Sequence, residues 1–339
     1  MLPLSILDLV PVREGQTPAE ALPTALDLAR HAERWNYRRF WVAEHHNMTG
    51  IASAATSVVI GYLAAGTSTI RVGSGGVMLP NHAPLVIAEQ FGTLESLYPG
   101  RIDLGLGRAP GTDQLTLRAL RRDPRWAEHF PEDVQELRKL FGPVQPDQKI
   151  RAVPGANLNI PIWILGSSLY GAQVAGYFGM PYAFASHFAP DALDLALREY
   201  RERFQPSEQL ATPWAMPCVN VVVADTDAEA RRLFTSLQIR FVSMVRNQRG
   251  LLQPPIDDID TYWSPAEKAH ASGMLACSFV GSPETVRAEL QRFIARTACD
   301  ELMVSAAIFD HDARLRSYEL LAEIGRQLEP VSAGMLGQV

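Results

Sequence analysis

Cysteine is scarce in this chain of 339 residues, and Cys218, Cys277 and Cys299 lie far apart. No Cys-x-x-Cys pair occurs, which argues against a structural zinc site and against a disulfide framework. Basic clusters are missing and the formal net charge is −6, so nucleic acid is not an expected partner. No apolar run is long enough to span a membrane, and residues 1–8 lack the basic start of a signal peptide. We therefore expect a cytoplasmic protein that does not bind membranes.

Two common catalytic and nucleotide-binding motifs are also missing. No Gly-x-Ser-x-Gly segment occurs, so the sequence gives no support to a hydrolase with a serine nucleophile elbow. The glycines Gly105, Gly107 and Gly111 resemble a dinucleotide-binding loop, but the last spacing is one residue too long and no acidic ribose partner follows. A Rossmann-type dinucleotide site is therefore not expected.

Short apolar segments alternate with helical segments along the whole chain. We expect strands at 4–10, 39–43, 70–77, 102–106, 161–165, 182–185, 216–224 and 301–306. Because these segments are apolar throughout, they are typical of parallel strands buried on both faces. Strict alternation indicates an α/β fold, either a closed barrel or a doubly wound sheet, and eight units favour a (β/α)8 TIM barrel.

The chain shows no break in composition that would mark a second domain. We therefore expect residues 1–339 to form one TIM-barrel domain, with insertions at about 142–160 and 247–280. The second insertion is long for a loop without structure of its own, which indicates a functional lid or disorder.

Four groups of polar or small residues follow or interrupt predicted strands. They are Glu44-His45-His46, Ser74-Gly75-Gly76, Gly107-Arg108 and Gly166-Ser167-Ser168. In a barrel of this kind the active site lies at the carboxyl ends of the strands. Their shared position therefore predicts one site built from all four groups.

Ser74-Gly75-Gly76 removes side chains from the middle of a predicted strand. Glycine within a strand often marks close approach of a ligand or of another backbone segment, so this stretch is a candidate floor for a flat ligand. A β-bulge or the start of a loop is the alternative explanation.

Arg108 and the Gly166-Ser167-Ser168 turn together indicate an anion site. A guanidinium at a strand end suits phosphate, and the first amides of a helix are free donors at the positive end of its dipole. The alternatives are a surface salt bridge for Arg108 and a plain serine N-cap. Together the two features favour phosphate.

Glu44-His45-His46 allows a metal site, a structural histidine or a catalytic histidine. Adjacent residues of a strand point in opposite directions, and no third or fourth ligand has metal-site spacing, so we expect no metal. Because histidine titrates near neutral pH, we expect His45 to face the substrate.

These motifs, in this order, resemble those of the bacterial luciferase-like flavin monooxygenases. The resemblance covers most of the chain and is strongest between residues 35 and 187. It rests on residues 40–46, 74–84, 99–108, 165–168 and 280–284. The light-producing luciferase chain has a cysteine at the position of Gly107, so the resemblance is to the members labelled only luciferase-like.

The resemblance implies a site that binds FMN. Arg108 and the backbone amides of Ser167 and Ser168, at the turn that begins with Gly166, would hold the phosphate. Gly75-Gly76, next to Ser74, would lie under the isoalloxazine ring, where the family often has a cis peptide bond between non-proline residues. His45 would lie beside the reactive edge of the flavin.

The implied activity is a monooxygenase reaction in which reduced FMN and O2 oxygenate a small organic substrate through a flavin C4a-peroxide. The implied partners are that substrate, O2, a separate NAD(P)H:flavin reductase and a second copy of the chain, paired through the small residues of 52–65. Residues 247–275 match the position of the family's lid. The alternatives are a deazaflavin- or FMN-dependent oxidoreductase, a non-catalytic flavin-binding protein and a metal-dependent barrel hydrolase.

Overall fold

A closed parallel β-barrel forms the centre of the computed structural model, which describes residues 1–109 and 112–331. The described strands are β1 (Leu4–Asp8), β2 (Arg39–Val42), β3 (Arg71–Met78), β4 (Ile102–Gly107), β5 (Ile162–Gly166), β6 (Tyr182–Phe184), β7 (Ala215–Val223), β8 (Ser278–Gly281) and β9 (Leu302–Ser305). Strands β1 to β7 and β9 close the barrel, with β6 paired to β7 and β9 paired to β1. The predicted (β/α)8 TIM barrel is therefore confirmed.

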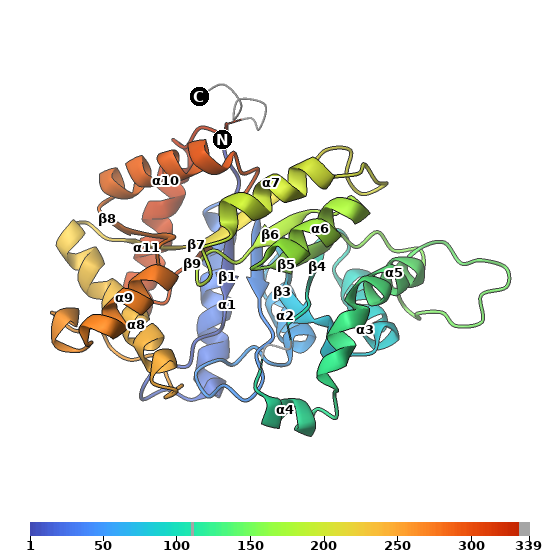
Figure 1. The fold of residues 1–339 in the computed structure, drawn as a ribbon, viewed down its shortest axis with the longest axis horizontal. Coiled ribbons are helices and arrows are strands. Elements are labelled where there is room, and N and C mark those ends of the chain that lie inside the picture. Colours follow the sequence, from blue (N-terminus) through green and yellow to red (C-terminus); the bar gives the residue numbers. More distant parts are fainter. Residues whose placement is uncertain (110–111, 332–339) are drawn as a thin grey trace.

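Helices surround the strands (Figure 1). They are α1 (Pro18–Arg34), α2 (Thr56–Ala65), α3 (Pro84–Leu97), α4 (Gln114–Ala119), α5 (Phe130–Phe141), α6 (Leu169–Phe178), α7 (Leu193–Arg203), α8 (Asp227–Val245), α9 (Pro265–Met274), α10 (Pro283–Thr297) and α11 (His311–Gly325), with short 3-10 helices at Leu79–Asn81, Pro124–His129 and Ile259–Thr261. In the described part of the chain, no helix combines the length and the apolarity that crossing a bilayer requires.

Local sequence signals explain where several helices begin. Thr17 and Glu20 form a reciprocal capping box at the start of α1, with Pro18 in the first turn. Thr226 accepts the amide of Glu229 at the start of α8. Both helices therefore begin where a threonine side chain satisfies one of their first free amides.

The predicted insertion at 247–280 has secondary structure of its own in its second half. Helix α9 and most of β8 lie within it, and β8 pairs with the carboxyl half of β7 on the outside of the barrel. Strand β8 has only four residues, two of them half-buried, so its sequence pattern is too short to distinguish it from a turn. Helix α9 does carry a recognisable start, a capping box formed by Ser264 and Glu267.

The other predicted insertion, at about 142–160, contains neither a helix nor a strand. This segment follows α5 and forms the loop that projects beside α5 and α3 in Figure 1. It then comes back to the carboxyl end of α5. There the amides of Asn157 and Leu158 donate to the carbonyls of Gly142 and Phe141.

A buried ionic network occupies the barrel interior at the amino ends of the strands. Arg39 donates to Glu301 and to Asp103, each at 2.7 Å, and its guanidinium lies 4.7 Å from the ring of Trp163. Trp41 donates to Asp103 from the layer above. Because each buried charge has a partner of opposite sign, this end of the barrel is filled without an isolated charge.

Candidate active site

A cavity of about 680 Å³ lies at the carboxyl ends of the barrel strands. Its walls come from the segments after β2, β4, β5 and β6, from β3 and from α8. A volume of several hundred cubic ångströms at this place in a barrel is typical of a cofactor or substrate site.

Seven of the eight predicted site residues line this cavity: His45, Gly75, Gly76, Arg108, Gly166, Ser167 and Ser168. The eighth, Ser74, is fully buried and is not among the lining residues. Its hydroxyl donates to the carbonyl of Gly105 at 2.8 Å and accepts the amide of the same residue at 2.9 Å. Ser74 therefore joins β3 to β4 beneath the cavity, which is a positioning role.

The floor of the cavity is the Gly75-Gly76 segment of β3, and these two residues are joined by the expected cis peptide bond. A Cβ on Gly75 would lie 2.8 Å from the side chain of Leu7, and one on Gly76 would lie 2.8 Å from the carbonyl oxygen of Gly105. The backbone here packs directly on its neighbours below, so only glycine leaves the surface above it flat.

Arg108 lies at one end of the cavity, beside the amino end of α6. Its guanidinium is 4.0 Å from the centre of the Tyr170 ring, and it has no carboxylate partner among the described residues. Ser168 is the N-cap of α6 but makes no side-chain capping bond, so the first amides of the helix remain available. A stacked guanidinium next to free helix amides can bind a phosphate.

His45 follows β2 and faces the cavity, half-buried. Its Nδ1 lies 2.5 Å from the carbonyl oxygen of Glu44. Because a carbonyl only accepts, Nδ1 carries the proton and Nε2 keeps its lone pair. Burial lowers the pKa of His45, and the charge of Arg240 lowers it further. Neutral His45 can therefore accept a proton at Nε2.

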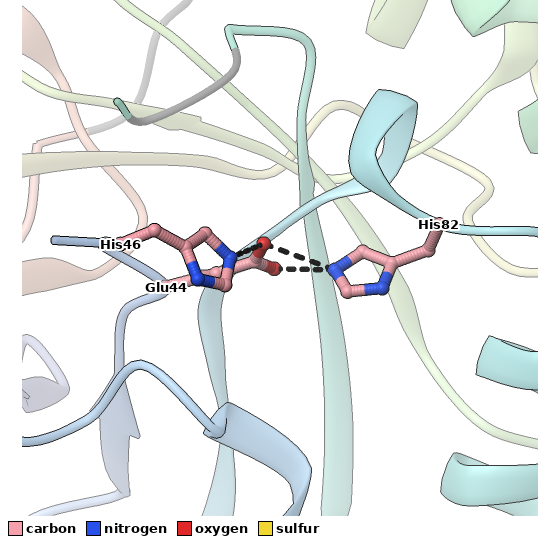
Figure 2. A group of neighbouring side chains, drawn as sticks. All are labelled: Glu44, His46 and His82. Atoms are coloured by element: carbon pink, nitrogen blue, oxygen red, sulfur yellow. Dashed lines mark hydrogen bonds and ion pairs between the residues drawn. The ribbon is translucent and has the colours of Figure 1, made fainter. Parts of the chain in front are cut away.

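His46 contacts the carboxylate of Glu44, two residues earlier in the chain. Figure 2 shows this carboxylate between the rings of His46 and His82. The Nε2 atoms of His46 and His82 lie 2.6 Å and 2.9 Å from its oxygens, and the amides of Met78 and Asn81 also donate to it. Burial alone would raise the pKa of Glu44, but these hydrogen bonds lower it to about 2.

The Glu44 cluster corrects one expectation from the sequence. A third candidate metal ligand does exist, because Glu44, His46 and His82 have ligand atoms within 4.8 Å of one another. Spacing along the chain could not reveal this, since the third residue comes from the segment after the next strand. Each candidate ligand atom already has a hydrogen-bond partner inside the cluster, so the cluster holds the segment after β2 against the end of β3.

Several lining residues were missed by the sequence analysis, chiefly His187, Asn220 and Arg240. His187 comes three residues after β6, the same strand-end position that identified the other candidates, so that signal was present. Arg240 lies within α8, between Ile239 and Phe241 on the wall of the cavity. A helical residue has no such positional marker, and only its tertiary position reveals it.

The segment expected to form a lid contributes to the cavity wall. Lining residues between 248 and 256 come from this segment, and Leu252 exchanges backbone hydrogen bonds with Val12 and Glu14 in the segment after β1. The amide of Leu252 donates to Val12 at 2.9 Å, and its carbonyl accepts from Glu14 at 2.8 Å. This part of the cavity wall is therefore anchored through the backbone to the segment after β1.

A closed (β/α)8 barrel with such a cavity at its carboxyl end defines an enzyme-type TIM barrel. The family model described as "Luciferase-like monooxygenase" matches residues 2–301. A protein named luciferase-like monooxygenase from Escherichia coli K12 is 55% identical over 325 residues, covering 96% of this chain and 97% of that protein. The chain belongs to the luciferase-like monooxygenase family and is an enzyme of that class.

Solved structures agree with this assignment. The crystal structure of apo-MsnO8 matches with a TM-score of 0.89 and 37% identity over 98% of this chain and 100% of that one. The oxygenating constituent of 3,6-diketocamphane monooxygenase from Pseudomonas putida, in complex with FMN, matches with a TM-score of 0.73 and 17% identity over 97% and 99%. At that identity the second match shows the fold alone.

Proposed function

We propose that this protein is an FMN-dependent monooxygenase that uses reduced flavin and O2 to oxygenate a small organic substrate. The observation that carries the proposal is the joint presence, in one cavity, of the Gly75-Gly76 floor, the neutral His45 imidazole and the Arg108 guanidinium stacked on Tyr170. Each matches a different part of a flavin nucleotide and its reaction.

The residues present fit FMN. Arg108 and the first amides of α6 would hold the phosphate, and the flat surface over Gly75 and Gly76 would take the ring, since no side chain projects from it. The FMN complex of the Pseudomonas putida protein supports the choice of cofactor on the level of the shared fold.

When bound, reduced FMN would supply the electrons that activate oxygen. His45 Nε2 would accept or return a proton beside the ring, a role worth roughly 10²–10⁴-fold in rate for a positioned acid–base group. The apolar side chains of Leu7, Trp41 and Met303 and the lid segment 248–256 would keep water away from the reacting atoms.

Two partners belong to the proposal. A separate NAD(P)H:flavin reductase would deliver the reduced cofactor to this cavity. A second copy of the chain would pair through α2 and its neighbours, where Val58 and Tyr62 are exposed. We propose that the protein works in the cytoplasm.

The experiment has two stages. Oxygen uptake with reduced FMN is first screened against aldehydes, ketones and aromatic compounds to obtain a substrate. His45→Ala is then compared with His270→Ala, which removes an exposed histidine from α9. We expect His45→Ala to lose roughly 10²-fold or more in turnover with FMN affinity nearly unchanged, and the control to behave as wild type.

Three results would contradict parts of the proposal. Unchanged turnover of the confirmed substrate by His45→Ala would remove the proton-transfer role. Turnover with a reduced deazaflavin in the absence of oxygen would replace the monooxygenase reaction by that of a deazaflavin-dependent oxidoreductase. Failure to bind reduced FMN at all would refute the cofactor assignment.

A further inference from the structure

The described residues that line the cavity include three arginines, Arg108, Arg240 and Arg249, and no aspartate or glutamate. The whole chain has a formal net charge of −6, so this bias is local. Cations lining a cavity without carboxylates attract anions. One anion, the phosphate, is already accounted for at Arg108, which leaves positive charge elsewhere in the cavity.

Arg240 is the cation that the phosphate does not explain. It extends from α8, which follows β7, whereas Arg108 follows β4, and the barrel places β5 and β6 between those strands. Arg240 is half-buried on the cavity wall, and within residues 1–109 and 112–331 it has neither an ion pair nor a hydrogen bond. Holding a guanidinium away from water without a partner is costly, so its position favours an anionic occupant.

His187 provides a second unpaired polar group in the same part of the cavity. Its Nδ1 is buried and has no hydrogen-bond partner in the part of the chain that the structure describes. Asn220 donates to the His187 carbonyl at 2.7 Å and thereby fixes the segment after β6. Burial lowers the pKa of His187 to about 3, and the charges of His45 and Arg240 contribute to the shift. The ring is therefore neutral near pH 7 and has an N–H to donate.

We propose that Arg240 and His187 form a carboxylate-binding site for the organic substrate. Arg240 would pair with the carboxylate, and the neutral imidazole of His187 would donate one hydrogen bond to it. The substrate class is then an organic acid whose apolar body lies along Met303, Phe241 and Met244. The assignment of this ligand as the substrate rests on the proposed function, whereas the anion site itself does not.

The test measures binding without flavin, by titration calorimetry on the full chain. Octanoate is compared with octanamide, which has a similar shape and no charge. We expect wild type to prefer octanoate by about tenfold or more, the range of a charge-assisted hydrogen bond in a partly buried site. Arg240→Gln should abolish this preference and leave the affinity for octanamide unchanged, and Arg240→Lys should retain part of it.

Two further variants serve as controls. Arg231→Gln removes an exposed arginine from the same helix and should keep the preference. Arg108→Gln should keep it too, while weakening the binding of FMN. His187→Phe should reduce the preference in part, because one hydrogen bond is lost while Arg240 remains.

Three outcomes would overturn the inference: no preference for octanoate in wild type, a preference that survives Arg240→Gln, or a preference lost in Arg108→Gln instead. A tenfold loss of affinity for reduced FMN in Arg240→Gln, with the octanoate preference intact, would assign Arg240 to the cofactor. Failure of the monooxygenase proposal would appear separately. The protein would then bind no FMN, or would take up no oxygen, and its preference for octanoate would be unaffected.

Discussion

Gly76 and Gly107 both line the cavity, yet the space around them differs. A Cβ on Gly76 would lie 2.8 Å from the carbonyl oxygen of Gly105, which belongs to the backbone of β4. A Cβ on Gly107 would lie 2.9 Å from the sulfur of Met78, the far part of a flexible side chain. The first collision requires a strand to move, while the second requires only a change of rotamer.

We predict that Gly76→Ala lowers the free energy of unfolding by about 1–3 kcal/mol and weakens FMN binding, because the cavity floor must shift. Gly107→Ala should cost less than about 1 kcal/mol, since Met78 can move aside. Urea unfolding and FMN titration of the two variants check this. Equal destabilisation by both substitutions would contradict it.

The single residues differ in how far the sequence could identify them. His45, Gly75, Gly76 and Arg108 could be found because each follows or interrupts a predicted strand, and barrel geometry brings strand ends together. Arg240 could not be found, because a lone arginine in a long helix normally faces solvent. Ser74 has the right neighbours but the opposite orientation, since successive strand residues point to opposite faces.

Helix α1 and strand β3 are joined by a single carboxylate. Oε1 of Glu33, near the end of α1, accepts the amides of Ser68, Thr69 and Ile70 at 2.8, 2.5 and 2.9 Å. Partial burial alone would raise the pKa of Glu33, but these amides lower it from 4.5 to about 2. The ionised carboxylate therefore holds the chain segment that leads into β3.

We predict that the stability contributed by Glu33 is present above pH 4.5 and is lost as the pH falls toward 2, because protonation weakens its hydrogen bonds. Near neutral pH, Glu33→Gln should cost about 1 kcal/mol, since water screens a partly exposed group. Urea unfolding of both proteins between about pH 7 and about pH 3 tests this. Glu323→Gln, an exposed change on α11, is the control. A difference that grows on acidification would contradict the prediction.

Among the elements, the strands that close the barrel were the most predictable, because continuous apolar runs between turn signals are typical of parallel strands. Strand β8 was not predicted from the sequence, because it pairs on one side only, with β7, outside the closed ring. Its stabilisation comes from a neighbour far away in sequence, and four residues cannot reveal that. The start of α9, by contrast, could have been read from Ser264 and Glu267.

For the molecule as a whole, the two ends of the barrel are built differently. At the amino ends of the strands, Arg39, Asp103 and Glu301 fill the interior with paired charges, and Trp41 closes the layer above them. At the carboxyl ends lies the cavity, which residues 248–256 help to line. Paired charges therefore fill one end of the barrel, and the cavity occupies the other.

Ligands of the proposed site would enter from the carboxyl end, because paired charges fill the amino end. The flavin would lie on β3 in the barrel wall and the substrate would be held by Arg240 on the surrounding helix α8, so we expect the cofactor to bind first and to leave last. We predict that saturating octanoate slows the release of FMN, measured by stopped-flow fluorescence. Release of FMN at an unchanged rate would contradict this order of binding. In that order of binding, the flavin would not be exchanged during turnover, and the proposed reductase would receive it only after the product has left.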